Sequence, residues 1–160
     1  MSGAPQVRLR LTMLVVVIVV ALDQVTKHWA VTWLPSREPV HVVWTLQWNL
    51  AFNSGMAFSK GKDLGMVIGF LALGIACYVG WVVRRNTSPL AALAAGLVIG
   101  GALGNVVDRL FRNRGWMRGS VVDFIDFQWF PIFNVADMAV NVGAVLFVIW
   151  TRGGAKRATT

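Results

Sequence analysis

Five of the seven acidic residues lie within apolar stretches of the sequence, where a carboxylate is costly to keep: Asp23, Asp108, Asp123, Asp126 and Asp137. Asp137 has no basic residue near it in sequence, so its partner must come from elsewhere. Asp123 can supply one, because a chain reversal would bring the two side chains together. Two adjacent carboxylates cannot both ionise cheaply, so one keeps its proton. Such a pair can activate a water and protonate a carbonyl oxygen or a leaving amine.

Asp126 is a rival of Asp123 for this role. In an extended segment the two side chains point to opposite faces, so only one of them can face Asp137. The 14 positions between Asp123 and Asp137 imply the pairing only weakly.

The remaining acids have structural interpretations. Asp23 and Lys27 are four residues apart, on one helix face, and are expected to form an ion pair near a membrane interface. Asp108 follows Asn105 by about one turn, and a polar cluster at a helix end is expected there. Arg109 either belongs to that cluster or holds an anionic or carbonyl group of a ligand, and both interpretations stay open.

Other catalytic chemistries find no support. His28 and His41 are the only histidines, no G-x-S-x-G or comparable nucleophile motif occurs, and metal ligands at close spacing are absent. Cys77 stands alone inside an apolar run, and we expect it to be a buried apolar residue. We therefore expect no metal site.

The composition indicates an integral membrane protein. Of 160 residues 56% are hydrophobic and only 14% are charged, too few charges to cover a soluble domain and too apolar for disorder. The net charge is +8, but no contiguous basic stretch suggests nucleic acid. The basic residues lie between apolar runs, where they would meet anionic lipid headgroups.

Four segments are long enough to span a bilayer, and helices are expected at about 10–30, 64–83, 89–108 and 132–151. The first resembles a signal peptide in outline, but no A-x-A-like site follows its apolar core, so we interpret it as a retained helix. Glycines at four-residue spacing, Gly96, Gly100 and Gly104 in the third helix and Gly65 and Gly69 in the second, predict close helix packing.

Two connections, about 32–62 and 109–131, are too long for simple turns. Alternating apolar residues from Val40 to Trp48, and the run from Val121 to Phe127, predict strands. Both connections lie on the side opposite the termini, as do all five embedded acids, so function is expected there. The basic residues divide almost equally between the two sides, so their distribution does not choose an orientation.

Five ordered blocks then carry a resemblance: Leu22-Asp23-Gln24-Val25-Thr26-Lys27, Phe52-Asn53-Ser54-Gly55-Met56-Ala57-Phe58, Gly104-Asn105-Val106-Val107-Asp108-Arg109, Val121-Val122-Asp123-Phe124 and Phe133-Asn134-Val135-Ala136-Asp137. Together they resemble the motif blocks of the bacterial lipoprotein signal peptidases, also called signal peptidase II, over nearly the whole chain. The resemblance implies an intramembrane aspartic endopeptidase. Such an enzyme cleaves the signal peptide from diacylglyceryl-modified prolipoproteins just before the lipidated cysteine.

The resemblance also implies residue roles. Asp123 and Asp137 fall on the catalytic positions. The substrate-binding positions are Asn53, Asn105, Arg109 and Asn134, and the supporting positions are Asp23, Lys27 and Asp108. The basic residues Arg112, Arg114 and Arg118 match no motif.

The implied fold is an all-α membrane protein with four transmembrane helices, a small extracytoplasmic β-like cradle and an amphipathic element. The implied setting is the bacterial cytoplasmic (inner) membrane, with both termini cytoplasmic and the active site on the extracytoplasmic side. Lipidated prolipoproteins and membrane lipids are the expected partners of a single 160-residue domain, with no cofactor and no nucleic acid. We expect a monomer.

Two other classes of protein remain as alternatives. A small proton-coupled transporter also carries intramembrane acids, but its essential acid is expected near the midplane rather than at one end. A structural assembly factor would explain the glycine stripes but not Asp123 with Asp137.

Overall fold

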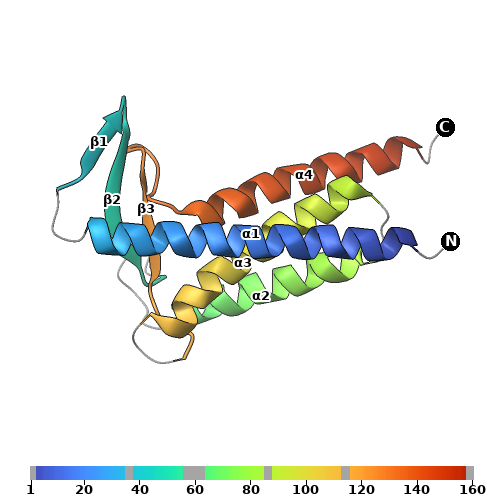
Figure 1. Cartoon of the computed structure of the whole chain (residues 1–160), viewed down its shortest axis with the longest axis horizontal. Helices are drawn as coiled ribbons and strands as arrows, with labels where there is room; N and C mark the ends of the chain where they lie inside the picture. The colour runs from blue at the N-terminus through green and yellow to red at the C-terminus, as the bar shows by residue number, and fades with distance from the viewer. Residues whose placement is uncertain (1–2, 35–37, 56–63, 85–87, 113–115, 158–160) are drawn as a thin grey trace.

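The computed structural model describes residues 3–34, 38–55, 64–84, 88–112 and 116–157. It contains four helices: α1 (Gly3–Trp33), α2 (Leu64–Val83), α3 (Pro89–Phe111) and α4 (Val135–Arg157). The three strands are β1 (Val40–Val43), β2 (Leu46–Asn53) and β3 (Val121–Asp126). Figure 1 shows the helices running alongside one another, with both termini at one end and the sheet at the other.

Each helix contains a segment that is long and apolar enough to cross a membrane: Arg8–Trp33, Gly65–Val83, Pro89–Phe111 and Val135–Gly153. The predicted fold class, four membrane-spanning helices with a small sheet, is confirmed. The amphipathic element remains a prediction, since residues 56–63, in one of the two long connections, lie outside the described residues.

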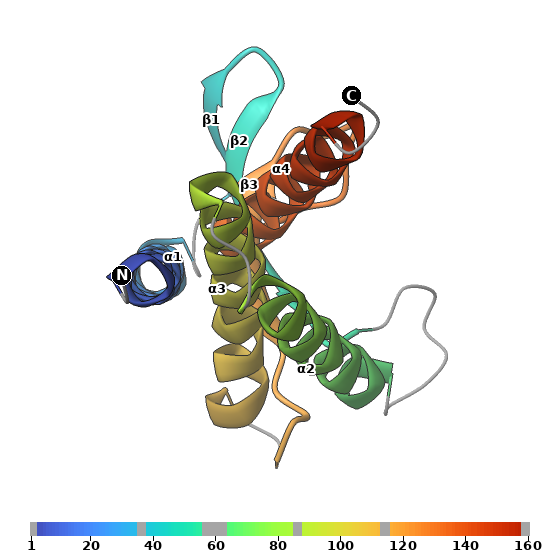
Figure 2. The same cartoon turned by 90° about the vertical axis from the view of Figure 1, so that its right-hand side faces the viewer.

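Helix α3 is the centre of the bundle, and α1, α2 and α4 all pack against it (Figure 2). Its glycines allow this close approach. A Cβ atom on Gly96 would lie 2.7 Å from the Cβ of Val15, and one on Gly100 would lie 2.8 Å from the Cβ of Val19. A Cβ on Gly104 would lie 2.6 Å from a carboxylate oxygen of Asp23. The expectation of tight helix packing along this stripe is confirmed.

Local capping explains where two of the helices begin. Ser88 caps α3, and Pro89 occupies its first turn, where a missing N–H costs nothing. Asn134 caps α4: its Oδ1 accepts from the N–H of Asp137 at 3.0 Å, and its own N–H donates to Asp137 Oδ2 at 3.2 Å. This reciprocal pair is a capping box, and α4 therefore begins at Val135 rather than at the expected residue 132.

The three strands form one antiparallel sheet in the order β1-β2-β3. The expectation of one strand from Val40 to Trp48 is wrong, because the chain reverses within it and Val40 pairs with Trp48. Trp44, at the turn, has a positive φ of 54°. The turn contains none of the usual glycine, proline or asparagine signals, so the alternation of apolar residues hides it.

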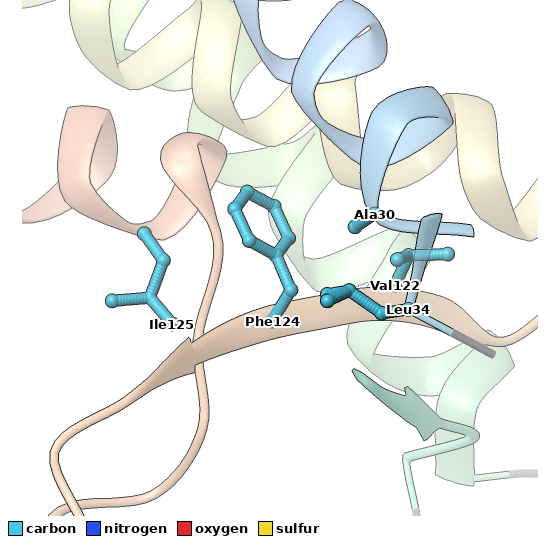
Figure 3. Close-up of a cluster of buried hydrophobic side chains, with 5 residues drawn as sticks. All are labelled: Ala30, Leu34, Val122, Phe124 and Ile125. Atoms are coloured by element: carbon cyan, nitrogen blue, oxygen red, sulfur yellow. The ribbon is translucent and has the colours of Figure 1, made fainter. Parts of the chain in front are cut away.

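The last turns of α1 pack on β3. Ala30 and Leu34 join Val122, Phe124 and Ile125 in one buried cluster (Figure 3). All six residues of β3 are buried. This packing fixes the strand that carries Asp123 against the end of the helical bundle.

Cys77 differs from its expected place, because it is exposed on α2. An apolar run in a membrane helix can face lipid as well as a protein core, so apolar surroundings in sequence do not establish burial.

Candidate functional site

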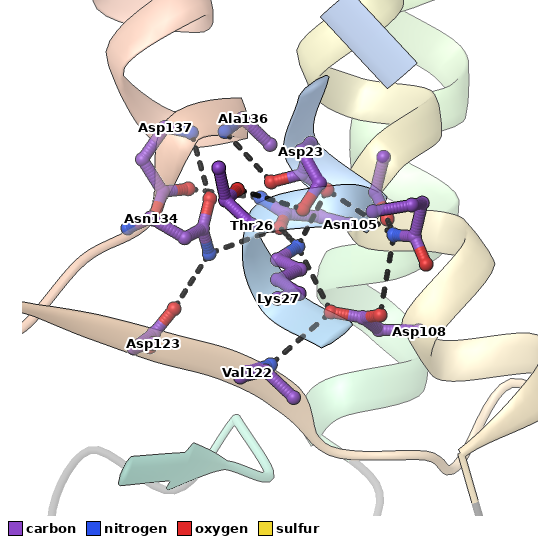
Figure 4. A network of polar contacts seen from close by, with 12 residues as sticks. Asp23, Thr26, Lys27, Asn105, Asp108, Val122, Asp123, Asn134, Ala136 and Asp137 are labelled. Carbon is purple, nitrogen blue, oxygen red and sulfur yellow. Dashed lines mark hydrogen bonds and ion pairs between the residues drawn. The ribbon is translucent and has the colours of Figure 1, made fainter. Parts of the chain in front are cut away.

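Asn134 joins the two acids that the sequence analysis proposed as a pair (Figure 4). Its Nδ2 donates to Asp123 Oδ1 at 2.6 Å, while its Oδ1 accepts from the backbone N–H of Asp137. Asp123 comes from the middle of β3 and Asp137 from the first turn of α4. The chain reversal between them therefore brings both carboxyl groups to one side chain.

Asn105 of α3 reaches the same place. Its Nδ2 donates to Asp137 Oδ1 at 2.8 Å, and its Oδ1 accepts from Lys27 Nζ at 2.9 Å and from Asn134 Nδ2 at 3.2 Å. Every polar atom of the Asn105 side chain is thus engaged, with the amide group oriented so that its N–H points at Asp137.

A cavity of about 720 Å³ opens beside these groups. Asp123, Asp137, Asn53, Asn105 and Arg109 line its polar part. Apolar residues of α2, α3 and α4 form most of the remaining wall, among them Ile68, Ala72, Ile75, Ala102, Met138 and Val142. Ile68, Ile75, Met138 and Val142 are exposed and belong to helices apolar enough to cross a membrane, so this apolar wall can be reached by lipid or by an apolar ligand.

Asp123 is 3% exposed, and its pKa is raised from 3.8 to about 6. Burial is the largest cause, and the nearby charge of Asp137 acts in the same direction, whereas hydrogen bonds from Asn134 and Asn53 lower the pKa in part. Asp123 therefore keeps its proton to a higher pH than an ordinary aspartate does.

Asp126 lies in a different environment on the same strand. It accepts hydrogen bonds from Gln47 Nε2 at 2.8 Å, Asn49 Nδ2 at 2.9 Å and the N–H of Gln128 at 2.6 Å. Burial raises the pKa of Asp126, but these three hydrogen bonds outweigh it and hold the pKa below its usual range. Asp126 does not line the cavity, so the structure pairs Asp137 with Asp123 rather than with its rival.

Arg109 faces the cavity with its charge partly unpaired. The side chain is 5% exposed, and its Nη1 has no hydrogen-bond partner among the described residues. A Cβ on Gly65 would lie 2.7 Å from this nitrogen, so the α2 glycine makes room for the guanidinium. Of the two interpretations left open, this geometry favours a ligand contact. Asp108, its neighbour in sequence, pairs with other cations.

A buried network of charged side chains lies next to the acidic pair. Lys27 Nζ lies 2.8 Å from Asp23 Oδ2 and 2.8 Å from Asp108 Oδ2, and all three side chains are fully buried. With Asn105 as third acceptor, the ammonium group has a partner for each of its three protons. The predicted Asp23–Lys27 ion pair is confirmed.

The network also fixes neighbouring elements. Asp23 Oδ1 accepts from the N–H of Ala136 at 3.0 Å, and Asp108 Oδ2 accepts from the N–H of Val122 at 3.1 Å. The first bond connects α1 to the start of α4, and the second connects α3 to β3. Both elements that carry the acidic pair are therefore held by this network.

Two members of the network escaped the sequence analysis. Arg112 Nε lies 2.6 Å from Asp108 Oδ1, and Gln24 Nε2 donates to both Asp23 and Asp108. The four-residue spacing of Asp108 and Arg112 was a usable signal, but the third helix was expected to end at 108, whereas α3 continues to Phe111. Arg114 lies outside the described residues.

Metal ligation finds no counterpart in the described part of the chain, where no group of three or more His, Cys, Asp or Glu residues lies close enough to hold an ion. The acidic pair is surrounded instead by amide groups.

Known proteins resemble this chain in both sequence and fold. A family model described as signal peptidase (SPase) II matches residues 15–152. The chain is 47% identical over 149 residues to the lipoprotein signal peptidase of Mycobacterium tuberculosis strain H37Rv, covering 92% of this chain and 74% of the relative. It is 42% identical over 135 residues to the lipoprotein signal peptidase of Rhodococcus jostii, covering 84% of this chain and 68% of that one.

A solved bacterial membrane enzyme structure superposes with a TM-score of 0.76 at 27% identity, covering 91% of this chain and 90% of that one. A second reaches a TM-score of 0.71 at 29% identity, with 88% and 91% covered. Sequence and fold agree along nearly the whole chain, and the chain belongs to the signal peptidase II family.

Proposed function

We propose that this protein is an aspartic endopeptidase that removes the signal peptide of diacylglyceryl-modified prolipoproteins just before the lipidated cysteine. The family and the names of its relatives support a lipoprotein signal peptidase. The observation that carries the aspartic mechanism is that Asp123 and Asp137 line one apolar-walled cavity and share Asn134. This arrangement favours the peptidase over the transporter and assembly-factor alternatives.

In the proposed mechanism Asp137 is the general base. Its two oxygens accept from Asn105 Nδ2 and from the N–H of Asn134, and it lies in the first turn of α4, where a negative charge is favoured. Asp123, whose pKa is raised to about 6, carries the proton in the reactive form of the pair. The pair thus starts the reaction with one shared negative charge.

The reaction then follows without a cofactor. Asp137 takes a proton from a water molecule, whose oxygen attacks the scissile carbonyl carbon, while Asp123 gives its proton to the carbonyl oxygen. Collapse of the tetrahedral intermediate breaks the C–N bond. Asp137 delivers its proton to the leaving amine, and Asp123 recovers its own from the gem-diol as the new carboxylic acid forms.

Three polar residues are proposed to contact the substrate, whereas Asn134, the fourth predicted binding residue, is fully buried and contacts the acidic pair instead. Arg109, Asn53 and Asn105 line the cavity, so their side chains can reach the carbonyl groups of an extended peptide. Asn134 orients Asp123 and Asp137 through its hydrogen bonds to both residues. The apolar wall from α2 to α4 suits the signal helix and the diacylglyceryl chains, which arrive within the bilayer.

Asp23, Lys27 and Asp108 are proposed as supporting residues, because their network holds α4 and β3 in place. We further propose a monomer in the cytoplasmic membrane, with both termini cytoplasmic and the cavity at the extracytoplasmic end. The sheet lies at the end of the bundle opposite the termini, as this orientation requires (Figure 1). Asp123 and Asp126 belong to the sheet, and Asp137 lies in the turn of α4 next to it.

The deciding experiment measures cleavage by purified variants, with thermal melting in parallel. Asn is nearly isosteric with Asp but cannot exchange the proton, so Asp123→Asn and Asp137→Asn should each abolish cleavage of a lipidated precursor while the protein stays folded. The double variant should cost little more than either single one, since the two act as a unit. Asp126→Asn is the matched control and should keep substantial activity.

Two outcomes would contradict this assignment. An inactive, folded Asp126→Asn together with an active Asp123→Asn would exchange their roles. Equal processing of lipidated and unlipidated precursors would remove the diacylglyceryl group from the proposed substrate.

A further inference from the structure

A second cavity lies at the opposite end of the bundle from the acidic pair. It has a volume of about 400 Å³ and is formed by α1, α2 and α3. Leu9, Met13, Val16, Val83, Ala95, Ile99 and Leu103 make its wall almost entirely apolar. We call it the terminal groove. No residue of the proposed catalytic site lines it.

Two arginines stand at the mouth of the terminal groove. Arg8 lies near the beginning of the membrane-crossing part of α1, and Arg84 directly follows the last residue of α2. The Nε of Arg8 is buried and has no hydrogen-bond partner among the described residues. A buried guanidinium N–H without an acceptor is costly, so an acceptor beyond the described residues, such as a bound ligand, would stabilise this arginine.

The surrounding charges leave the two arginines uncompensated. The acids that the structure describes, Glu38, Asp23, Asp108, Asp123, Asp126 and Asp137, belong to the sheet end of the bundle or to the buried network. The described cations at the terminal end include Arg10 and Arg152 besides the two of the groove. The mouth of the groove is thus positive, and its interior is apolar.

This combination matches one chemical class. We propose that the terminal groove binds an anionic phospholipid, with the phosphate held between Arg8 and Arg84 and an acyl chain lying along the groove. Guanidinium groups bind phosphate oxygens through paired N–H donors. A choline group on the same phosphate would offset the negative charge of the phosphate and crowd the approach of the arginines. The span from Arg8 to Val16 covers about 12 Å of helix rise, enough to hold a large part of an acyl chain.

The lipid comes from the leaflet on the side of the termini. It is therefore distinct from the diacylglyceryl group of the proposed substrate, which would enter the cavity at the other end. Lipid binding at the groove needs no catalysis, so the result of a binding test does not depend on the proposed peptidase activity.

The test measures lipid binding by native mass spectrometry of the purified protein in neutral detergent. Phosphatidylglycerol and phosphatidylcholine with identical acyl chains are titrated separately. We expect the parent protein to retain phosphatidylglycerol at concentrations where phosphatidylcholine is lost. Arg8→Gln and Arg84→Gln should each weaken phosphatidylglycerol binding about ten-fold, the loss expected for a charge-assisted hydrogen bond.

Two controls distinguish lipid binding in the terminal groove from non-specific electrostatic attraction to the protein surface. Arg152→Gln removes an exposed cation at the same end but outside the groove, and it should leave the affinity unchanged. Gly80→Leu keeps both arginines but extends a side chain into the groove. A Cβ at this position would meet only Ile99, at an ordinary 3.7 Å, so the helix itself tolerates the change. This variant should also weaken binding.

Three results would overturn the proposal. Equal retention of the two lipids would remove the role of charge. An Arg152→Gln effect as large as that of Arg8→Gln would show that only net charge matters. Unchanged binding by Gly80→Leu would show that the headgroup binds at the surface and that the groove holds no chain.

Discussion

Lys27 Nζ donates to Asn105 Oδ1 at 2.9 Å, and this bond fixes which way the Asn105 amide faces. With its oxygen held by the ammonium group, Asn105 can present only N–H to Asp137, 2.8 Å away. A lysine that never touches the cavity therefore controls the hydrogen bonding of a proposed catalytic carboxylate. Lys27, in a motif block of α1, thus orients the amide that contacts Asp137 of α4.

Replacing Lys27 by Met should destabilise the protein strongly. The change leaves the fully buried carboxylates of Asp23 and Asp108 without their shared cation. Breaking a buried ion pair by removing one partner costs about 3–5 kcal/mol. Thermal melting in detergent measures the loss. Adding Asp23→Asn to Lys27→Met should recover part of it, because one unpaired charge disappears. A Lys27→Met protein that melts with the parent would contradict the network's supporting role.

The pH dependence of cleavage should report the proton on Asp123. Its pKa of about 6 means that the acid form is lost as the pH rises through that value, so kcat/KM should fall there. The free energy of unfolding should also fall as the pH rises. The pKa of Asp123 in the folded protein lies above the ordinary 3.8, so its contribution to stability is greatest below about pH 4. This contribution is lost as the pH rises through about 6.

Asp123→Asn provides the control, because Asn stays neutral throughout this range. The melting temperature of the parent minus that of Asp123→Asn should decrease between pH 4 and pH 7. A difference that stays flat or increases would mean that Asp123 holds no extra proton in the folded protein.

Arg109→Gln should weaken substrate binding more than it slows the chemical step. Arg109 lines the cavity, its Nη1 has no hydrogen-bond partner among the described residues, and a hydrogen bond from a charged donor contributes about 1.5–3 kcal/mol. KM for a lipidated precursor should therefore rise about ten-fold to a hundred-fold, with a smaller change in kcat. Arg112→Gln is the comparison, since Arg112 pairs with Asp108 and should act through stability. An unchanged KM for Arg109→Gln would assign Arg109 to the structural cluster instead.

Gly104→Ala should separate the helices that Gly104 allows to meet. The added Cβ would lie 2.6 Å from Asp23 Oδ2 and 3.3 Å from the Cβ of Ala136, where no flexible end can move aside. Both the melting temperature and the cleavage rate should drop. Gly74→Ala in α2 is the matched control: nothing lies within 4 Å of its Cβ, so the change should be neutral or slightly stabilising. Equal behaviour of the two variants would show that the bundle adjusts freely at Gly104.

The sequence predicted the parts of the fold that composition and periodicity determine. Four apolar runs of spanning length allow few alternatives once water is absent, because each backbone polar group must find its partner within its own helix. The acids were informative for the same reason: a carboxylate in apolar sequence needs a partner, and the fold supplies Asn134 and Asn105 for Asp137.

Other features depended on contacts between distant segments. The role of Arg112 required knowing that α3 extends to Phe111, beyond the end expected at residue 108. The turn at Trp44 has no sequence signal, since its positive φ is held by the pairing of β1 with β2. Cys77 showed a further limit: in a membrane protein the lipid and the core demand the same residues, so hydrophobicity alone does not say which way a helix faces.

The exposed apolar wall of the acidic cavity has a kinetic consequence. Its rim includes Ile68 of α2 and Val142 of α4, two helices that share α3 as their main support (Figure 2). A ligand entering there diffuses in two dimensions, so encounters depend on how many substrate molecules are present per lipid, not per volume of solution. Adding empty lipid at constant enzyme and substrate would slow such an enzyme by surface dilution alone.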